Sequence, residues 1–412
     1  MAATSLPDAQ NFVTSNCPPL DAVNIALRDA LGCVLAEDVV STEEVPPFAN
    51  TAMDGFAVRA ADIGSVPCEL QVIATLAAGG EPTTPVGPGQ AIRIMTGAAM
   101  PSGADSIVPV ENVDPQVAPD TVRVLIKPAV GDAVRAAGED VAVGSLVFGK
   151  GSVLTAGHLG VLASVGRESV SLHRKIRVGV LSTGDELISP PTPLRIGQIR
   201  DSNRHTLLAL VAEANAIPVD LGLARDTEDE IRAKVEEGIA TCDALVTSGG
   251  VSVGDFDFVK VVLDKLSSAG AQPMRWMQVA IKPAKPLAFG LIDGKPVFGL
   301  PGNPVSSMVS FELFARPALR RMMGHHDAAL QRTAINAVAG ETLKRAPDGK
   351  THFARVWAAF DPDGRLVVRS AGGQGSNLLR TMALANALAV LPDGPAITEG
   401  ESVQVLLLGP VV

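Results

Sequence analysis

Hydrophobic and polar positions follow a regular order between residues 175 and 323. Short β-branched runs predict buried strands, and the segments between them carry apolar residues at helical spacing. The expected strands are 177–183, 218–223, 244–248 and 296–300, and the expected helices are 203–216, one opening at Thr227, one near 256–266 and a final one after residue 300. This repeated order predicts a parallel sheet with helices on its faces, which binds ligands at the carboxyl ends of its strands.

The helix that opens at Thr227 has its own start signal. Thr227 and Glu230 have the spacing of a capping box, in which each side chain bonds to a backbone N–H of the other residue. Apolar residues then recur at Ile231, Val235 and Ile239, so one face of this helix is expected to be buried.

The flanks of this α/β region show a different pattern. Gly, Pro and Asp turns separate segments in which every second residue is apolar, namely 91–95, 121–126, 352–357, 365–370 and 402–408. Such alternation is typical of strands with one buried face. We therefore expect β-rich domains from about 69 to 126 and from about 333 to the end.

Composition places the chain among globular proteins. It has 412 residues, of which 47% are hydrophobic and 19% charged. That length exceeds one hydrophobic core and predicts several domains. The net charge of −10 and the 3% aromatic content without Tyr argue against nucleic acid or anionic lipid as a partner, because phosphates need cations and bases need stacking surfaces.

Cysteine usage and the chain's start indicate a cytoplasmic protein. The four cysteines form no C-x-x-C pair, which argues against a zinc site or disulfide framework and favours reduced thiols. The start, MAATSLPDAQ, lacks a basic stretch followed by an apolar one, and no apolar run approaches the roughly 20 residues that span a bilayer.

Three loops that follow expected strands carry residues typical of an anion site. They contain Asp185 and Glu186 after the first strand, Ser248, Gly249, Gly250 and Ser252 after the third, and Pro301, Gly302, Asn303 and Pro304 after the fourth. Glycines let backbone amides approach an anion. Asn303 suits an N-cap and Pro304 the first helical position, so free N–H groups would face the ligand. Each loop alone also fits an ordinary turn, but together they predict a site for an anionic or nucleotide-like ligand.

Charged residues in the same region extend this site. Lys282 and Lys285 stand between prolines, and although surface lysines are usually solvated, fixed amines beside a phosphate cradle supply positive charge for phosphate or molybdate. Glu186, Asp226 and Asp257 follow or border strand ends. Carboxylates that face an anion require a cation between them, and hard oxygen ligands favour Mg²⁺ over zinc.

The N-terminal region adds three runs, PPFANTAMDGFAVR at 46–59, IMTGAAMPSGAD at 94–105 and VRAAGEDV at 134–141. As structure alone, Asp54 lies in a turn and Thr96 at a strand exit. The residue types leave their role open.

Together with LSTGDEL, DSNR, SGGVSVGD, IKPAKP and GLPGNPVS, these runs closely resemble the MoeA family of molybdopterin molybdenumtransferases, which includes the gephyrin E domain and its plant counterparts. The resemblance covers nearly the whole chain. It implies an elongated domain formed by 1–43 and 143–174, a β-rich insertion at 44–142, an α/β molybdopterin-binding domain at 175–323 and a small C-terminal β domain at 324–412.

The resemblance also implies a function. A member of this family inserts molybdenum from molybdate into adenylylated molybdopterin with Mg²⁺ and releases AMP. It implies an elongated homodimer whose cleft lies between the α/β domain of one subunit and the inserted domain of the other. A transient contact with molybdopterin adenylyltransferase is a further expectation.

Roles are carried over motif by motif. The implied catalytic residues are Asp54, Thr96, Asp140, Glu186, Asp226 and Asp257, with the last three as Mg²⁺ ligands. The implied substrate or anion contacts are Arg135, Ser248, Gly249, Gly250, Ser252, Lys282, Lys285, Pro301, Gly302, Asn303 and Pro304. Ala136 and Ala137 stand where the family often has arginines, and Gln278 stands where some relatives have lysine, so we expect a weaker cationic side.

Three other functions compete with this interpretation. A molybdopterin adenylyltransferase shares the α/β fold but needs neither the inserted nor the C-terminal domain. A receptor-clustering scaffold would not need Asp54, Glu186 and Asp257 together. A nucleotide pyrophosphatase, as in related competence-damage proteins, would release AMP without inserting metal.

Overall fold

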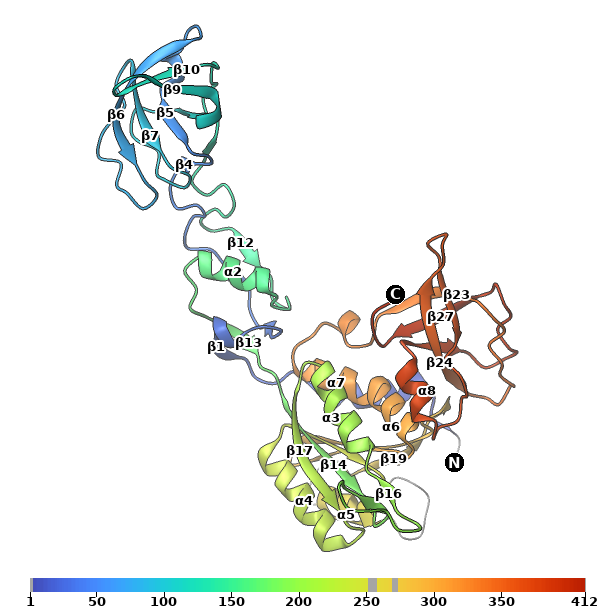
Figure 1. The fold of residues 1–412 in the computed structure, drawn as a ribbon. Helices are drawn as coiled ribbons and strands as arrows, with labels where there is room; N and C mark the ends of the chain where they lie inside the picture. The colour runs from blue at the N-terminus through green and yellow to red at the C-terminus, as the bar shows by residue number, and fades with distance from the viewer. Residues whose placement is uncertain (1–2, 251–257, 269–272, 412) are drawn as a thin grey trace. The chain divides into compact units, whose positions relative to one another are not determined.

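The computed structural model describes residues 3–250, 258–268 and 273–411. The chain forms two compact units. The large unit comprises Met1–Val23, Gly32–Ala36 and Ser171–Val412, and the small unit comprises Asn24–Leu31 and Glu37–Val170. Figure 1 colours both along the chain. Each unit is described by itself.

The small unit is built around a mixed six-stranded sheet in the order β8-β5-β7-β6-β10-β9. Its strands are β5 (Gly55–Val58), β6 (Cys68–Leu76), β7 (Gln90–Ile94), β8 (Ser106–Pro109), β9 (Val113–Ala118) and β10 (Thr121–Val124). Strands β6 and β7 run parallel, and the other pairings are antiparallel. The expected strands at 91–95 and 121–126 are therefore confirmed within one or two residues.

Short elements complete the small unit. Two-stranded ribbons pair β11 with β4 and β12 with β3. The bounds are β3 (Val39–Val40), β4 (Asn50–Thr51), β11 (Val134–Arg135), β12 (Leu146–Phe148), α2 (Ala156–Ser164), η1 (Leu27–Asp29), η2 (Ala60–Asp62) and η3 (Val110–Asn112). A three-stranded sheet of β1 (Val23–Ala26), β13 (Ser169–His173) and β2 (Val34–Leu35) contains positions where the chain passes from one unit to the other.

The main sheet of the large unit has the order β17-β14-β18-β22-β21-β19. Its strands are β14 (Arg177–Thr183), β17 (Ile217–Ala224), β18 (Ala244–Ser248), β19 (Arg275–Gln278), β21 (Pro286–Ile292) and β22 (Lys295–Leu300). The first four in the sheet are parallel, which confirms the expected strands and their direction. Strand β21 pairs antiparallel with β22 and β19; it was not expected and makes the sheet mixed.

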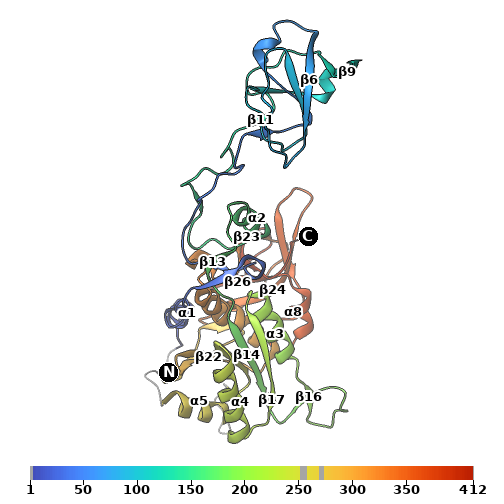
Figure 2. The same cartoon turned by 90° about the vertical axis from the view of Figure 1, so that its left-hand side faces the viewer.

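Helices cover both faces of this sheet (Figures 1 and 2). On one face α4 (Glu228–Thr241) and α5 (Phe258–Ser268) share a core with Leu181 and Leu245. On the other face lie α1 (Leu6–Ser15), α3 (Asn203–Glu213), α6 (Pro304–Ser310), the π-helix η4 (Phe311–Ala315) and α7 (Arg316–Met322), around Val178, Val180 and Val246. The expected helices are confirmed, and α1 was not expected.

The start of α4 differs in one respect from the expected capping box. The Thr227 hydroxyl accepts a hydrogen bond from the Glu230 N–H at 3.4 Å, as expected. The Glu230 carboxylate, however, accepts from the N–H of Arg225 at 3.0 Å. The Glu230 carboxylate therefore bonds to the loop after β17, two residues before Thr227, and not to the N–H of Thr227 itself.

The C-terminal sheet has the order β20-β24-β25-β23-β27-β26, and an added pairing of β24 with β26 closes it on itself. Its strands are β20 (Ile281–Lys282), β23 (Ala334–Ala339), β24 (Thr351–Phe360), β25 (Leu366–Ser370), β26 (Ala387–Leu391) and β27 (Ser402–Leu407). The three strands expected here are confirmed. Strand β20 comes from the segment that precedes β21, so the α/β part of the chain contributes a strand to this sheet. The remaining elements are β15 (Leu187–Ile188), β16 (Ile199–Arg200), η5 (Asp327–Ala329) and α8 (Leu379–Leu384).

No helix within the described part of the chain is long and apolar enough to cross a membrane.

A buried ion pair fixes the helix that follows β22. The carboxylate of Glu312 on η4 is 2% exposed and accepts two hydrogen bonds from Arg332, at 2.8 and 2.7 Å. Arg332 lies just before β23 and also contacts Glu213 at the end of α3, at 2.6 Å. The ion pair thus joins the C-terminal part of the chain to two helices of the α/β sheet.

We predict that Arg332→Met lowers the free energy of unfolding by about 3 kcal/mol, because Glu312 is then buried without its main partner. The Lys234–Glu237 pair on α4 is exposed and serves as the control. Lys234→Met should change stability by less than about 0.5 kcal/mol. Urea unfolding followed by circular dichroism measures both, and equal effects of the two substitutions would contradict the prediction.

Candidate active site at the strand ends

Three parallel strands of the large unit end at one edge of the sheet. Ser182 lies opposite Ser248, and Ser248 lies opposite Leu300, so β14, β18 and β22 end side by side. The loops that follow surround a cavity of about 320 Å³. Its lining consists of Thr183, Glu186, Leu187, Ile199, Arg200, Asp201, Ser202, Asn203, Ser248, Gly249, Gly302, Asn303, Pro304 and Asn377. We call this space the strand-end cavity.

Six residues predicted from the sequence line the strand-end cavity: Glu186, Ser248, Gly249, Gly302, Asn303 and Pro304. Gly250 follows directly in the chain, and Pro301 is buried between Leu300 and Gly302. Ser252 and Asp257 lie outside the described residues. The three loops that the strand pattern predicted to meet therefore do meet.

Glycine is required where the loop after β18 begins. Gly249 has a φ of +99°, and a Cβ there would lie 3.0 Å from the Thr183 carbonyl oxygen. Both the backbone conformation and the close approach to β14 would strain any other residue at this position. The backbone of the glycine loop is thereby held against the end of the neighbouring strand.

The turn after β22 starts α6 as expected but differs in its capping. Asn303 occupies the N-cap position and Pro304 the first helical position, but the Asn303 side chain makes no capping hydrogen bond. The N–H of Val305 donates to the carbonyl oxygen of Ser376 at 3.1 Å. One of the N–H groups expected to face a ligand is thus used by the C-terminal domain, whose next residue, Asn377, lines the cavity.

The start of α3 closes the cavity from a third direction. The Asn203 amide NH₂ donates to the Ser248 hydroxyl and to the Gly302 carbonyl oxygen, both at 2.7 Å. Asp201 is buried and accepts from the Ser182 hydroxyl at 3.0 Å and from Arg204 at 2.9 Å. These contacts fix the DSNR segment relative to β14, β18 and β22. The sequence showed this motif, but nothing in it indicated which of its side chains reach the cavity.

Three carboxylates gather beside the cavity at the ends of β14 and β17. The Asp226 N–H donates to Asp185 at 3.2 Å. Burial raises the pKa of Asp226, and the negative charges of Asp185 and Glu186 raise it further. Within the described residues, no three acidic, histidine or cysteine side chains converge closely enough to hold a metal by themselves. Because Asp257 is not described, the predicted Mg²⁺ ligand set stays a prediction.

Lys282 does not line the strand-end cavity. It lies on β20 and lines a second cavity of about 330 Å³, together with Lys344, Arg345, His352 and Arg355. We call this space the cationic cavity. Lys285 is exposed, and its carbonyl oxygen accepts from the Val279 N–H at 2.7 Å in the turn before β21. Neither lysine is among the residues that line the strand-end cavity, and their predicted anion-binding roles stay predictions.

Arg355 is the residue of the cationic cavity that the sequence did not indicate as functional. Its side chain is buried, with 1% of the residue exposed. Its guanidinium donates to the carbonyl oxygens of Gly373 and Gly375 at 3.2 and 3.1 Å, while its Nε has no partner. Among the described residues no carboxylate pairs with it, and burial lowers its pKa. Arg355 lies on the face of β24 opposite Val356 and Ala358, which belong to the core of the C-terminal sheet, so the alternating pattern did not indicate that it would be buried.

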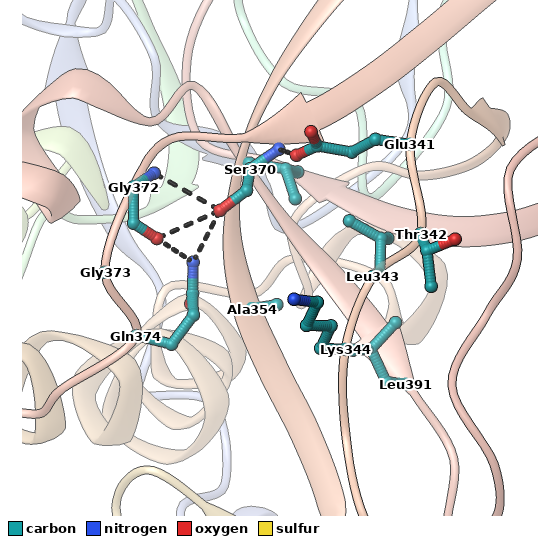
Figure 3. Close-up of a pocket in the computed structure, with 11 residues that line it drawn as sticks. Glu341, Thr342, Leu343, Lys344, Ala354, Ser370, Gly372, Gly373, Gln374 and Leu391 are labelled. Atoms are coloured by element: carbon teal, nitrogen blue, oxygen red, sulfur yellow. Dashed lines mark hydrogen bonds between the residues drawn. The ribbon is translucent and has the colours of Figure 1, made fainter.

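A third cavity, of about 370 Å³, lies in the C-terminal domain and shares Lys344, Ala354, Gln374 and Leu391 with the cationic cavity. Figure 3 shows the side chains of Gln374 and Ser370 pointing toward each other on one wall of this cavity. The Gln374 amide donates to the Ser370 hydroxyl at 3.3 Å and to the Gly372 carbonyl at 3.0 Å. These hydrogen bonds hold the loop that contains Gly373 and Gly375, whose carbonyl oxygens accept from Arg355.

In the small unit, the structure brings Asp54 and Thr96 together. The Asp54 carboxylate accepts from both the N–H and the hydroxyl of Thr96, each at 2.7 Å. These two bonds, the backbone one first, lower the pKa of Asp54. The next residue, Gly55, has no space for a side chain, because a Cβ there would lie 2.3 Å from the Val108 carbonyl oxygen.

Arg135 lies on β11 of the small unit, and Asp140 lies in the segment that follows this strand. Arg135 pairs with Asn50 across β11 and β4, and the N–H of Asp140 donates to the Val45 carbonyl at 2.9 Å. Both side chains are exposed. Their predicted roles stay predictions.

Comparison with known proteins identifies the family. Residues 4–166 match the MoeA N-terminal region (domain I and II), residues 179–321 match the probable molybdopterin binding domain, and residues 336–408 match the MoeA C-terminal region (domain IV). A molybdopterin molybdenumtransferase of Haemophilus influenzae is 36% identical over 409 residues, which cover 97% of this chain and 98% of that protein. The chain belongs to the MoeA family.

Other MoeA relatives agree with this assignment. Molybdopterin molybdenumtransferase 2 of Mycobacterium tuberculosis is 38% identical over 97% of this chain and 98% of its own. The crystal structure of a molybdopterin biosynthesis MoeA protein from Pyrococcus horikosii is 29% identical and covers 99% of this chain and 100% of its own, with a TM-score of 0.78. The expected fold class, an α/β domain with an inserted and a C-terminal β-rich domain, is therefore confirmed. The four domain boundaries stay predictions.

The contact between Asp54 and Thr96 in this MoeA protein leads to a test by titration. Thr96→Val removes the hydroxyl donor, so the pKa of Asp54 should rise while staying below its ordinary value, because the backbone N–H is retained. Carboxyl-carbon NMR titration measures this pKa. Thr121→Val, at a half-buried threonine of β10 whose hydroxyl donates to the Pro119 carbonyl, is the control and should leave the pKa of Asp54 unchanged. An unaltered Asp54 pKa in Thr96→Val would contradict the observed geometry.

Proposed function

We propose that this protein inserts molybdenum into adenylylated molybdopterin and releases AMP. The relatives named above are molybdopterin molybdenumtransferases. The observation that carries the proposal is the arrangement of Glu186, Ser248, Gly249, Gly302 and Asn303 around one strand-end cavity. Such a cavity, at the carboxyl ends of parallel strands, is where α/β sheets bind nucleotide-like ligands.

The cationic cavity is proposed as the site of the molybdate oxyanion. A buried guanidinium without a carboxylate partner is costly unless an anion compensates it. Arg355 has this surrounding, and Lys282 lines the same cavity. Guanidinium and ammonium groups together provide the charge-assisted hydrogen bonds that a tetrahedral oxyanion accepts. Lys282 thus keeps its predicted anion-binding role, with Arg355 as its partner.

Mg²⁺ is proposed as the cofactor, held by Glu186, Asp226 and Asp257. Burial, and after it the negative charges of Asp185 and Glu186, raise the pKa of Asp226, and a divalent cation would compensate these charges. Mg²⁺ commonly uses one or two carboxylates together with substrate phosphates and water, so three converging protein ligands are not required. When bound, the ion would offset the charge of the pyrophosphate link.

The protein's own groups position the substrates. In the proposed reaction water attacks the pterin-side phosphorus of the pyrophosphate link, the bridging P–O bond breaks, AMP leaves with the electron pair, and two protons are released. The two sulfurs of the pterin dithiolene then replace one oxygen of molybdate, which takes up two protons and leaves as water, so molybdenum stays in the +6 state and no cysteine of the protein is needed. Rate enhancement comes from orientation and charge compensation without a covalent enzyme intermediate.

The proposal includes a cytoplasmic homodimer in which the small unit of the partner subunit completes the site. It also includes a transient contact with the adenylyltransferase that supplies the substrate. Among the competing functions, adenylyl transfer is disfavoured because the family match extends to residues 4–166 and 336–408. A scaffold would not need both Asp54 and Glu186, so their presence favours an enzyme. A pyrophosphatase would release AMP without inserting metal, so metal insertion distinguishes the proposed function from that alternative.

Two catalytic variants test the proposed reaction and the shared site. Asp54→Ala and Glu186→Ala should each lower AMP release at least about 10²-fold while the protein stays folded. Asp29→Ala, at an exposed residue of the small unit, is the control. AMP release and metallated pterin are measured with purified protein, adenylylated molybdopterin, Mg²⁺ and molybdate. Full activity of either variant would refute its assigned role.

Mixing the two inactive variants tests the homodimer. If each site combines Asp54 of one subunit with Glu186 of the other, random reassociation restores about a quarter of wild-type activity, because half of the dimers carry one intact site. A site within a single chain would give no recovery. Absence of recovery despite subunit exchange, verified with tagged chains, would refute the shared site.

A variant of Arg355 tests the oxyanion site. Arg355→Met should raise the molybdate concentration for half-maximal metal insertion at least about tenfold, because a charge-assisted hydrogen bond is lost. AMP binding should stay unchanged. Arg355→Lys keeps the charge and should recover part of the effect, and Arg365→Met, at an exposed arginine of the same domain, is the control. An unchanged molybdate dependence in Arg355→Met would rule out this role.

A further inference from the structure

Among the described residues that line the strand-end cavity, one is positively charged. This residue is Arg200 on β16, and it is exposed. Glu186 and Asp201 carry the opposite charge, and the other described lining residues are uncharged. A substrate with a pyrophosphate link would bring further negative charge into this space. The position of the cation therefore decides where such phosphates are attracted and where they are repelled.

The charge of Asp201 is already compensated within the protein. Its carboxylate is buried and accepts a hydrogen bond from the Arg204 guanidinium at 2.9 Å. Arg204 also forms an ion pair with Asp220, and it is not among the residues that line the cavity. Two carboxylates thus occupy Arg204, so it offers no free charge to a ligand.

Arg200 makes a different set of contacts. One N–H of its guanidinium donates to the carbonyl oxygen of Thr192 at 2.7 Å. A carbonyl accepts a hydrogen bond without neutralising the positive charge, and no carboxylate within the described part of the chain forms an ion pair with Arg200. A guanidinium has five N–H donors, so this bond leaves most of them available. The side chain is therefore anchored and still keeps its charge for a ligand.

Backbone contacts hold Arg200 beside the loop that follows β14. Strands β15 and β16 pair in parallel, and Arg200 lies opposite Ile188. The N–H of Ile199 donates to the Glu186 carbonyl oxygen at 2.8 Å. On the other side, Asp201 accepts a hydrogen bond from the end of β14. The backbone of Arg200 is thus fixed between two segments that form the cavity, which lowers the entropy lost when its side chain binds a ligand.

We infer that Arg200 binds a phosphate group of the substrate's pyrophosphate link. A planar guanidinium binds phosphate oxygens through pairs of charge-assisted hydrogen bonds. The inference rests on the proposed function, which supplies this substrate, and it adds a protein cation to a cavity that otherwise presents carboxylates. The phosphate that leaves with AMP and the phosphate that stays on the pterin share this chemistry, so the test distinguishes them.

The test uses Arg200→Met in the full chain. Isothermal titration in the presence of Mg²⁺ measures the dissociation constants of ADP, AMP and adenosine, which share the nucleoside and carry two, one and no phosphate groups. We expect the dissociation constant of ADP to rise about tenfold, because a charge-assisted hydrogen bond to phosphate is lost. The constant of adenosine should stay within about twofold, because no contact to the nucleoside is removed.

The result with AMP identifies the phosphate. If AMP loses affinity as ADP does, Arg200 binds the phosphate that leaves with AMP. If ADP loses affinity and AMP does not, Arg200 binds the second phosphate, which stands in for the one on the pterin. Both results support the inference.

Arg195→Met is the matched control. Arg195 lies between β15 and β16, is exposed and is not among the residues that line the cavity. Its substitution removes the same charge from the same segment, and this variant should bind all three probes as the wild type does. An equal loss of ADP affinity in the two methionine variants would assign the effect to the overall charge of the segment and overturn the inference.

Three further results would also overturn it. These are an unchanged ADP affinity in Arg200→Met, an equal loss of adenosine affinity in that variant, and no binding of ADP to the wild type at millimolar concentration. The wild-type insertion assay is run in parallel. If it shows no metal insertion while Arg200→Met still loses ADP affinity, the proposed function fails and the phosphate contact of Arg200 stands.

Discussion

The parallel pairing of β14, β18 and β22 is the constraint on which the strand-end cavity depends. Backbone hydrogen bonds hold these strands in a register that ends them together. The loops that follow cannot separate without breaking that ladder. Asn203 adds a side-chain link, because its one amide bonds to the end of β18 and to the turn after β22. Loop residues thereby gain the positional precision of a sheet, which a binding site requires.

The C-terminal domain is part of the site's construction. Ser376 accepts the N–H of Val305 at the start of α6, and Asn377 lines the strand-end cavity. Arg332 pairs with buried Glu312 on the same helical segment. Strand β20 extends the C-terminal sheet from the α/β side. The helix after the Pro-Gly-Asn-Pro turn is therefore held at both its start and its middle by residues that follow it in the chain.

Charge is separated within the large unit. Carboxylates of Asp185, Glu186 and Asp226 gather near the strand-end cavity, and their repulsion contributes to the raised pKa of Asp226. Positive groups, including buried Arg355, line the cationic cavity. The proposed reaction combines a phosphate-linked substrate and a cation with a free oxyanion, and two cavities of opposite charge would hold these groups separately.

The pattern of apolar residues alone predicted the bounds of β14 and β18 to the residue. It also predicted α3, α4 and the alternating strands of the flanks, because the spacing of apolar residues along an element indicates which of its positions are buried. It also placed Glu186, Gly249 and Asn303 at one sheet edge, since parallel strands end together. Only the tertiary structure decided that Lys282 joins Arg355 in another cavity, that Glu230 bonds to Arg225, and that the Asn203 amide joins Ser248 to Gly302. Those outcomes depend on contacts between segments up to 99 residues apart, and no local pattern carries the geometry of such contacts.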